Sequence, residues 1–297
     1  MTEKLSGGIK RRLGIQGKPV EWIMRFVFLA AACASVLAVA LICIFLFANG
    51  IPAMSEIGLP DFLFGQKWKP SNNLYGILPF ILGSIYVTAG SVIIGVPTAL
   101  LTAVFLAFYC PKRLYPVLKA MINLMAGIPS VVYGFFGLVL IVPLMRQLTG
   151  KDGSTMLTAS ILLGIMILPT VTGVVEPALR SVPDSYYEGA LALGATHERS
   201  VFFAVLPAAK SGVIAGVVLG IGRSIGETMA VIMVAGNQTW MPQGILKGLR
   251  TMTTNIVMEM GYAADLHREA LIATGVVLFV FILIINLCVS ALKRRSL

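Results

Sequence analysis

Charged residues are scarce in this sequence. Only 12% of its 297 residues are Asp, Glu, Lys or Arg, whereas 57% are hydrophobic. A soluble domain of this length cannot bury so much apolar surface. The shortage of charge therefore excludes an ordinary soluble protein and indicates a membrane protein.

Groups that bind metals or nucleotides are also rare. The two histidines, His197 and His267, are expected on opposite sides of the membrane, which excludes a shared metal or catalytic site. The four cysteines lack metal-ligand spacing. No Gly-x-x-x-x-Gly-Lys-Ser/Thr loop occurs, so the chain has no phosphate-binding loop of its own for ATP. We therefore expect no metal, no cofactor and no enzyme activity in this chain.

Long apolar runs dominate what is present. A transmembrane helix needs about 20 mostly apolar residues, and six runs meet that length, which predicts an all-α polytopic membrane protein with about six transmembrane helices. The runs are 22–47, 78–109, 121–145, 157–179, 211–235 and 270–292. The predicted parts are a basic tail (1–21), a first transmembrane helix (22–48), an external segment on the membrane interface (49–75), a five-helix core (76–292) with a hairpin (181–207) and an external loop (236–269), and a second tail (293–297).

The distribution of Lys and Arg predicts the orientation. If the N-terminus is cytoplasmic and the chain crosses six times, 15 of the 23 basic residues lie on the cytoplasmic side and 7 on the other. Cytoplasmic segments carry such an excess, so both termini are predicted to be cytoplasmic. The net charge of +10 then reflects topology and lipid headgroups, and nucleic-acid binding is not expected.

The fifth run carries two charges, Arg223 and Glu227. A charge at the centre of a membrane helix costs at least about 2.5–3.5 kcal/mol. On a continuous helix the two side chains share a face with Gly212, Gly216 and Gly220 and can neutralise each other. Two compatible interpretations are open: a structural ion pair that locks this helix to another, or an arginine that meets an anion in a transport pathway while Glu227 holds it.

Two other predicted membrane helices contain proline. Gly127 and Pro129 lie in the third run, and Pro169 lies in the fourth. Proline removes a backbone donor and disturbs the preceding turn, so kinks are predicted at both places. A broken helix can expose backbone groups to a substrate, although kinks also occur without that role.

The loop 180–209 contains helix signals. Asp184 or Ser185 can cap a helix that ends at Gly194, and a second helix from Thr196 is expected to end before Pro207. This pattern predicts a helical hairpin on the cytoplasmic face, with an ordinary loop as the alternative. Three residues, 208–210, separate the hairpin from the fifth run. A push on the hairpin would thus reach the helix with the two charges, which favours the transport interpretation.

The same loop resembles the coupling motif of ABC-importer permeases, Glu-Ala-Ala, three residues, Gly, nine residues, Ile, one residue, Leu-Pro. Departures are Gly189 for the second-position alanine and Ala204 for the isoleucine. The segments 127–134 and 222–231 look like those of phosphate-specific permeases of the PstC type. The matching motif residues are Glu188, Gly189, Ala190, Gly194, Leu206 and Pro207.

The resemblance implies a type I, MetI-like permease fold and a subunit of an ATP-driven importer of inorganic phosphate in the bacterial inner membrane. It implies as partners a PstA-like permease, two copies of a PstB-like ATPase that bind the ATP and receive residues 188–207 in a groove, and a PstS-like phosphate-binding protein. Three alternatives remain: a permease for another oxyanion such as sulfate, an ion-coupled carrier or channel that acts alone, and a membrane scaffold whose buried charges serve packing.

Overall fold

The computed structural model describes residues 19–295, and within this range the chain is helical apart from loops and one short β-hairpin. Among the described residues, five helices are long and apolar enough to cross a membrane, or six if the bent pair 197–208 and 210–226 forms one span. The all-α, polytopic architecture predicted above is therefore confirmed. The chain divides into two units, which meet between Asn49 and Gly50.

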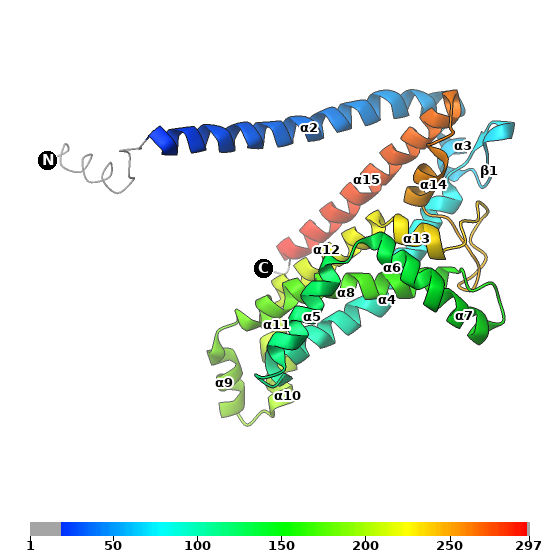
Figure 1. Ribbon diagram of the computed structural model, residues 1–297. Helices are drawn as coiled ribbons and strands as arrows, with labels where there is room; N and C mark the ends of the chain where they lie inside the picture. The colour runs from blue at the N-terminus through cyan, green and yellow to red at the C-terminus, as the bar shows by residue number, and fades with distance from the viewer. Residues whose placement is uncertain (1–18, 296–297) are drawn as a thin grey trace. The chain divides into compact units, whose positions relative to one another are not determined.

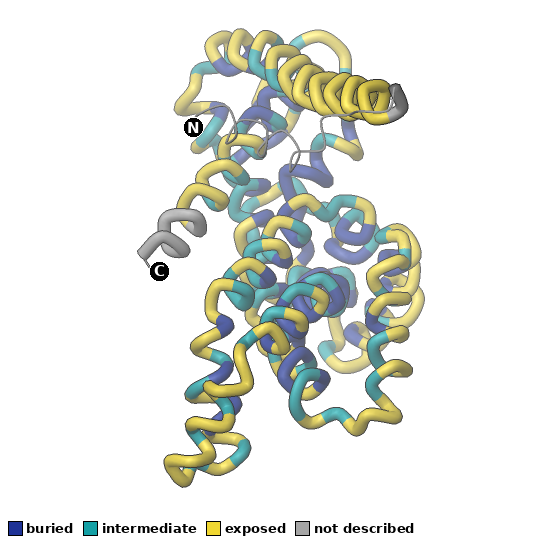
Figure 2. Tube along the Cα trace, turned by 90° about the vertical axis from the view of Figure 1, so that its left-hand side faces the viewer, coloured by how far each residue is buried: buried dark blue, intermediate teal, exposed yellow. Residues whose placement is uncertain are grey.

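Most of the first unit is helix α2 (Pro19–Ile57), which extends ten residues beyond the predicted apolar run (Figure 1). Large side chains such as Trp22, Phe26 and Leu37 are exposed along it. Exposed residues cover most of the helix before Asn49, whereas buried residues gather in the interior of the second unit (Figure 2). A helix that is apolar on every side suits contact with lipid.

The second unit is built around α8 (Met156–Arg180), which is 67% buried over its most apolar window, the largest share among the candidate spans of the described chain. On one side lies α4 (Leu78–Val104), which continues into a π-helical turn, η2 (Phe105–Tyr109). An added Cβ at Gly95 would lie 2.7 Å from the carbonyl oxygen of Gly164 in α8. Small residues allow this close approach of two helix backbones.

Helix α8 also contacts α12 (Lys210–Gly226). The glycine face predicted for the fifth run makes this contact: Cβ atoms added at Gly212, Gly216 and Gly220 would lie within 2.7 Å of side-chain atoms of α8. The chain ends with α15 (Asp265–Arg295), which begins five residues before the predicted sixth run. The predicted glycine face is thus a contact between two helices of the same chain.

The third apolar run, predicted as a helix over 121–145 with a kink at Gly127 and Pro129, is interrupted at that place. Ile128 is extended (φ −70°, ψ 126°), and Pro129 occupies the position before the next helix. The segments are α5 (Tyr115–Gly127), α6 (Ser130–Phe136), the π-helical turn η3 (Gly137–Ile141) and α7 (Val142–Thr149).

The predicted hairpin is present at one end of the unit, which we call the hairpin end (Figure 1). Two details differ: Pro183 rather than Asp184 or Ser185 precedes the first helix, and the second helical segment passes through Pro207. Gly194 has φ +85°, a conformation that favours glycine. The hairpin consists of α9 (Asp184–Ala192), α10 (His197–Ser200), the π-helical turn η4 (Val201–Val205) and α11 (Leu206–Ala208).

The opposite end, called the loop end, carries short elements. Trp68 pairs with Tyr75 across a two-stranded antiparallel hairpin. Phe62 and Trp68 are buried inside the protein, whereas Phe64 is exposed. The elements are α3 (Leu59–Phe64), β1 (Trp68–Lys69), the 3-10 turn η1 (Pro70–Asn72), β2 (Leu74–Tyr75), α13 (Met229–Val234) and α14 (Met252–Glu259).

Candidate functional site

The fifth apolar run is broken at Glu227, so the continuous helix predicted for 211–235 is wrong. Glu227 is extended (φ −70°, ψ 130°) between the end of α12 and the start of α13. Its Oε1 accepts the backbone N–H groups of Thr228 (3.1 Å) and Ala230 (3.2 Å). The first N–H groups of a helix lack partners within it and favour a negative charge. Glu227 therefore caps α13.

Arg223 does not pair with Glu227. Between residues 19 and 295 the ion pairs involve Glu176 and Glu259 instead. The Nε of Arg223 is buried and has no hydrogen-bond partner among the described atoms. The predicted i,i+4 ion pair is absent because the helix on which it depends ends at Gly226, which turns the Glu227 carboxylate towards α13.

Several elements meet around this break. The hydroxyls of Ser91 in α4 and Ser224 in α12 are 2.6 Å apart, and Thr253 Oγ1 of α14 donates to the carbonyl of Glu227 (3.2 Å). On α12, Gly222 and Gly226 face open space: apart from the adjoining residues of the helix itself, no described atom lies within 4 Å of an added Cβ. The helix is therefore anchored on two sides and open on a third, next to Arg223.

The interruption of the third run lies close to the same place. Gly127 ends α5, and α6 packs on α13 so tightly that a Cβ at Gly134 would lie 2.9 Å from the Cα of Ala230. Tyr133 Oη donates across the interruption to the carbonyl of Met125 (2.9 Å). Pro169, by contrast, lies inside α8, which runs without interruption. The structure thus packs the helix that follows one of the two predicted proline sites against α13, the helix that follows the break at Glu227.

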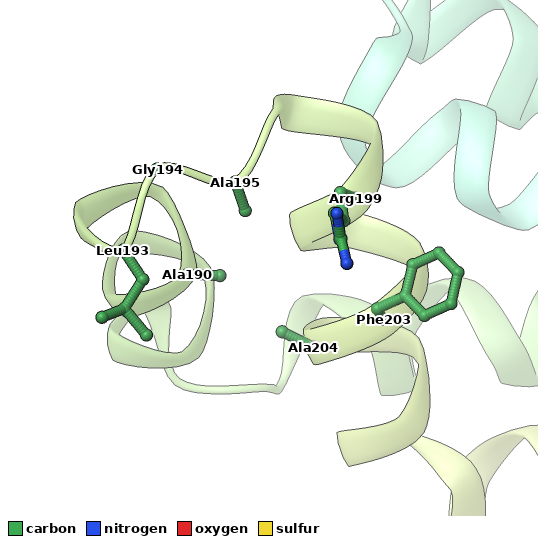
Figure 3. Close-up of a pocket in the computed structure, with 7 residues that line it drawn as sticks. All are labelled: Ala190, Leu193, Gly194, Ala195, Arg199, Phe203 and Ala204. Atoms are coloured by element: carbon green, nitrogen blue, oxygen red, sulfur yellow. The ribbon is translucent and has the colours of Figure 1, made fainter.

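The motif residues of the hairpin lie at its surface. Glu188 and Gly189 are exposed, whereas Ala190 and Gly194 line an open cavity of about 450 Å³ (Figure 3). Leu206 and Pro207 lie in α11. Beside the cavity, Leu193 is 92% exposed and Phe203 is 77% exposed. Uncovered apolar side chains of this size on a projecting hairpin make it a candidate interaction surface.

A polar cluster at the loop end escaped the sequence analysis. The buried carboxylate of Glu259 accepts Trp68 Nε1 (2.8 Å), His267 Nε2 (2.9 Å) and a guanidinium N–H of Arg250. Burial, together with the charge of Glu259, raises the pKa of the nearby Tyr262 hydroxyl. Because 191 residues separate Trp68 from Glu259, no local spacing indicates this cluster.

Comparison with known proteins defines the class. The family described as "binding-protein-dependent transport system inner membrane component" matches residues 95–296. The fold is similar to that of the MetNI methionine ABC transporter, with a TM-score of 0.62 and 20% identity over 78% of this chain and 100% of that one. The chain belongs to this family: it is a multi-pass membrane permease of an ABC importer with a MetI-like fold.

Individual relatives narrow the class. The chain is 37% identical over 278 residues to a probable ABC transporter permease protein, YqgH, of Bacillus subtilis, covering 91% of this chain and 90% of that protein. It is 32% identical over 274 residues to the probable phosphate transport system permease protein PstC of Methanocaldococcus jannaschii, covering 84% and 86%. The resemblance to PstC-type permeases inferred from the motifs is therefore confirmed.

Proposed function

We propose that this permease imports inorganic phosphate and that Arg223 meets the anion. The observation that carries the proposal is the buried Nε of Arg223, which lacks an acceptor among the described atoms. An unpaired guanidinium within a membrane span is costly, and its planar fork of donors fits the oxygens of a tetrahedral oxyanion. The similarity to PstC proteins favours phosphate over sulfate.

The second charged residue has a supporting role in this proposal. Glu227 holds the first turn of α13 through two backbone N–H groups, so its negative charge is directed to the helix terminus. Arg223 then keeps its positive charge available to a substrate. In the substrate pathway Arg223 contacts the anion, and Glu227 keeps the break in shape.

The energy for transport comes from ATP bound by a separate ATPase. The exposed Leu193 and Phe203 beside the hairpin cavity provide an apolar surface for that subunit on the cytoplasmic side. By analogy with PstC proteins, the complex contains a PstA-like second permease, two PstB-like ATPases and a PstS-like phosphate-binding protein. No cofactor is assigned to this chain, both termini are cytoplasmic, and hydrolysis takes place in the ATPase.

Uptake of radiolabelled phosphate into vesicles that contain the purified complex and ATP tests the proposal. Arg223→Gln should abolish phosphate uptake while the complex still assembles. Arg223→Lys should also show little uptake, because the ammonium group of lysine lacks the planar fork of N–H donors of a guanidinium. Arg268→Gln, at an exposed arginine of the loop end, serves as the matched control. Normal phosphate uptake by the Arg223→Gln variant would refute the role of Arg223. If the wild-type complex imported sulfate but not phosphate, the proposed substrate would be wrong. Phosphate uptake by the wild-type protein without ATP would favour an ion-coupled carrier.

A further inference from the structure

A buried carboxylate joins three segments at the hairpin end. Glu176, near the end of α8, is 2% exposed. It accepts the hydroxyl of Tyr115 (2.9 Å) and Nζ of Lys119 (2.8 Å), both in α5, and Nε of Arg180. Arg180 also donates to the carbonyl of Leu106 in η2 (2.7 Å), and its guanidinium carbon lies 4.5 Å from the centre of the Tyr115 ring. These five residues, the Glu176 cluster, connect α5, α8 and η2.

The position of α5 depends on this cluster because little else holds the helix. Among its thirteen residues only Ile122 is buried. At its far end α5 continues into the extended residues 128–129, and one bond, from Tyr133 to Met125, spans that interruption. Within a membrane, apolar burial against protein gains little over contact with lipid, so polar bonds between helices carry more of the specificity.

The cluster also lies directly beside the hairpin. Arg180 is the last residue of α8, and Ser181 to Pro183 lead straight into α9. This linker lies between a cavity of about 260 Å³, lined in part by Tyr186, and a cavity of about 310 Å³, lined in part by Phe108. The two cavities leave space beside the linker on both sides, while Val182 packs against the buried cluster that contains Leu179.

We propose that the Glu176 cluster is a latch that passes movement of the hairpin to α5. The proposal rests on the transport function above and adds a second route to the connection between the hairpin and α12. Movement of the linker displaces Arg180, Glu176 transfers the displacement to Lys119 and Tyr115, and α5 carries it to the interruption that packs against α13. Glu176 is therefore a positioning residue for the site at Arg223.

The test uses the full complex in vesicles and measures the ratio of phosphate imported to ATP hydrolysed. Glu176→Gln should lower this ratio at least about fivefold, the lower end of typical coupling between sites, while ATP hydrolysis continues. Lys119→Met should act in the same direction, and Lys112→Met, at an exposed lysine before α5, should keep the wild-type ratio. A purely structural cluster would reduce the yield of complex and leave the ratio of the surviving complex unchanged.

A second readout does not require that phosphate is the substrate. Spin labels at Ala120→Cys in α5 and Gly173→Cys in α8, in a chain whose four native cysteines are replaced by serine, report the distance between the helices with and without ATP. The latch predicts an ATP-dependent change that Glu176→Gln or Lys119→Met reduces or broadens. Unchanged distances and a wild-type ratio in both variants would overturn the latch. A wild-type complex that imports no phosphate yet shows the distance change would overturn the substrate and retain the latch.

Discussion

Replacing Glu227 by glutamine distinguishes a helix cap from an ion pair, because the two roles lose different interactions. As a cap, Glu227 offers one oxygen to two N–H groups. Glutamine keeps that acceptor and loses the interaction of the charge with the helix dipole, about 0.3–1 kcal/mol. Alanine also loses the cap, about 0.5–2 kcal/mol. Removing one member of a buried ion pair would instead cost about 3–5 kcal/mol for either substitution.

The assay is the free energy of unfolding of the purified chain in detergent, measured by denaturant titration. The expected order of stability is wild type, Glu227→Gln, Glu227→Ala, with small steps between them. A double-mutant cycle with Arg223→Gln sharpens the test, since independent sites add within about 0.3–0.5 kcal/mol. The reasoning fails if Glu227→Gln costs as much as Glu227→Ala and the cycle gives a coupling energy of about 3 kcal/mol.

Two further predictions concern packing and the loop end. Glu259→Gln leaves the buried Arg250 without its counter-charge and should lower the free energy of unfolding by about 3–5 kcal/mol. Glu269→Gln, at an exposed glutamate, should change it by no more than about 0.5 kcal/mol. Denaturant titrations of the two variants measure both values. Gly95→Ala should lower the free energy of unfolding by about 1–3 kcal/mol, because the added methyl group meets the α8 backbone. Gly173→Ala, at a glycine with open space around it, should be neutral or stabilising. Equal melting temperatures for the two variants would contradict the close contact between Gly95 and α8.

Two of the six apolar runs predict the bounds of membrane helices closely. The predicted ranges 78–109 and 157–179 compare with helical segments 78–109 and 156–180. The agreement follows from the bilayer, whose thickness sets the length of apolar sequence that a helix needs. The interruptions are harder to predict. Pro129 signals the first, but the second has no proline and depends on the cap made by Glu227.

The site could be predicted in part. The cost of a charge inside the membrane is enough to single out Arg223. Its pairing with Glu227, however, follows only from the periodicity of a continuous helix, and the helix ends between these two residues. Glu176 finds two of its partners, Tyr115 and Lys119, and Glu259 finds Trp68 in segments 57 to 191 residues away along the chain. Contacts of that kind arise from tertiary packing, so a single sequence without relatives does not indicate them.

The close backbone contact between α4 and α8 bears on which parts of the permease can move. Gly95 and Gly164 leave so little space that sliding one helix past the other would drive backbone atoms together. Close-packed interfaces resist such continuous deformation. We therefore expect α4 and α8 to keep their positions relative to each other during transport, and the conformational change to involve the short segments beside the two interruptions, α5, α6 and α13.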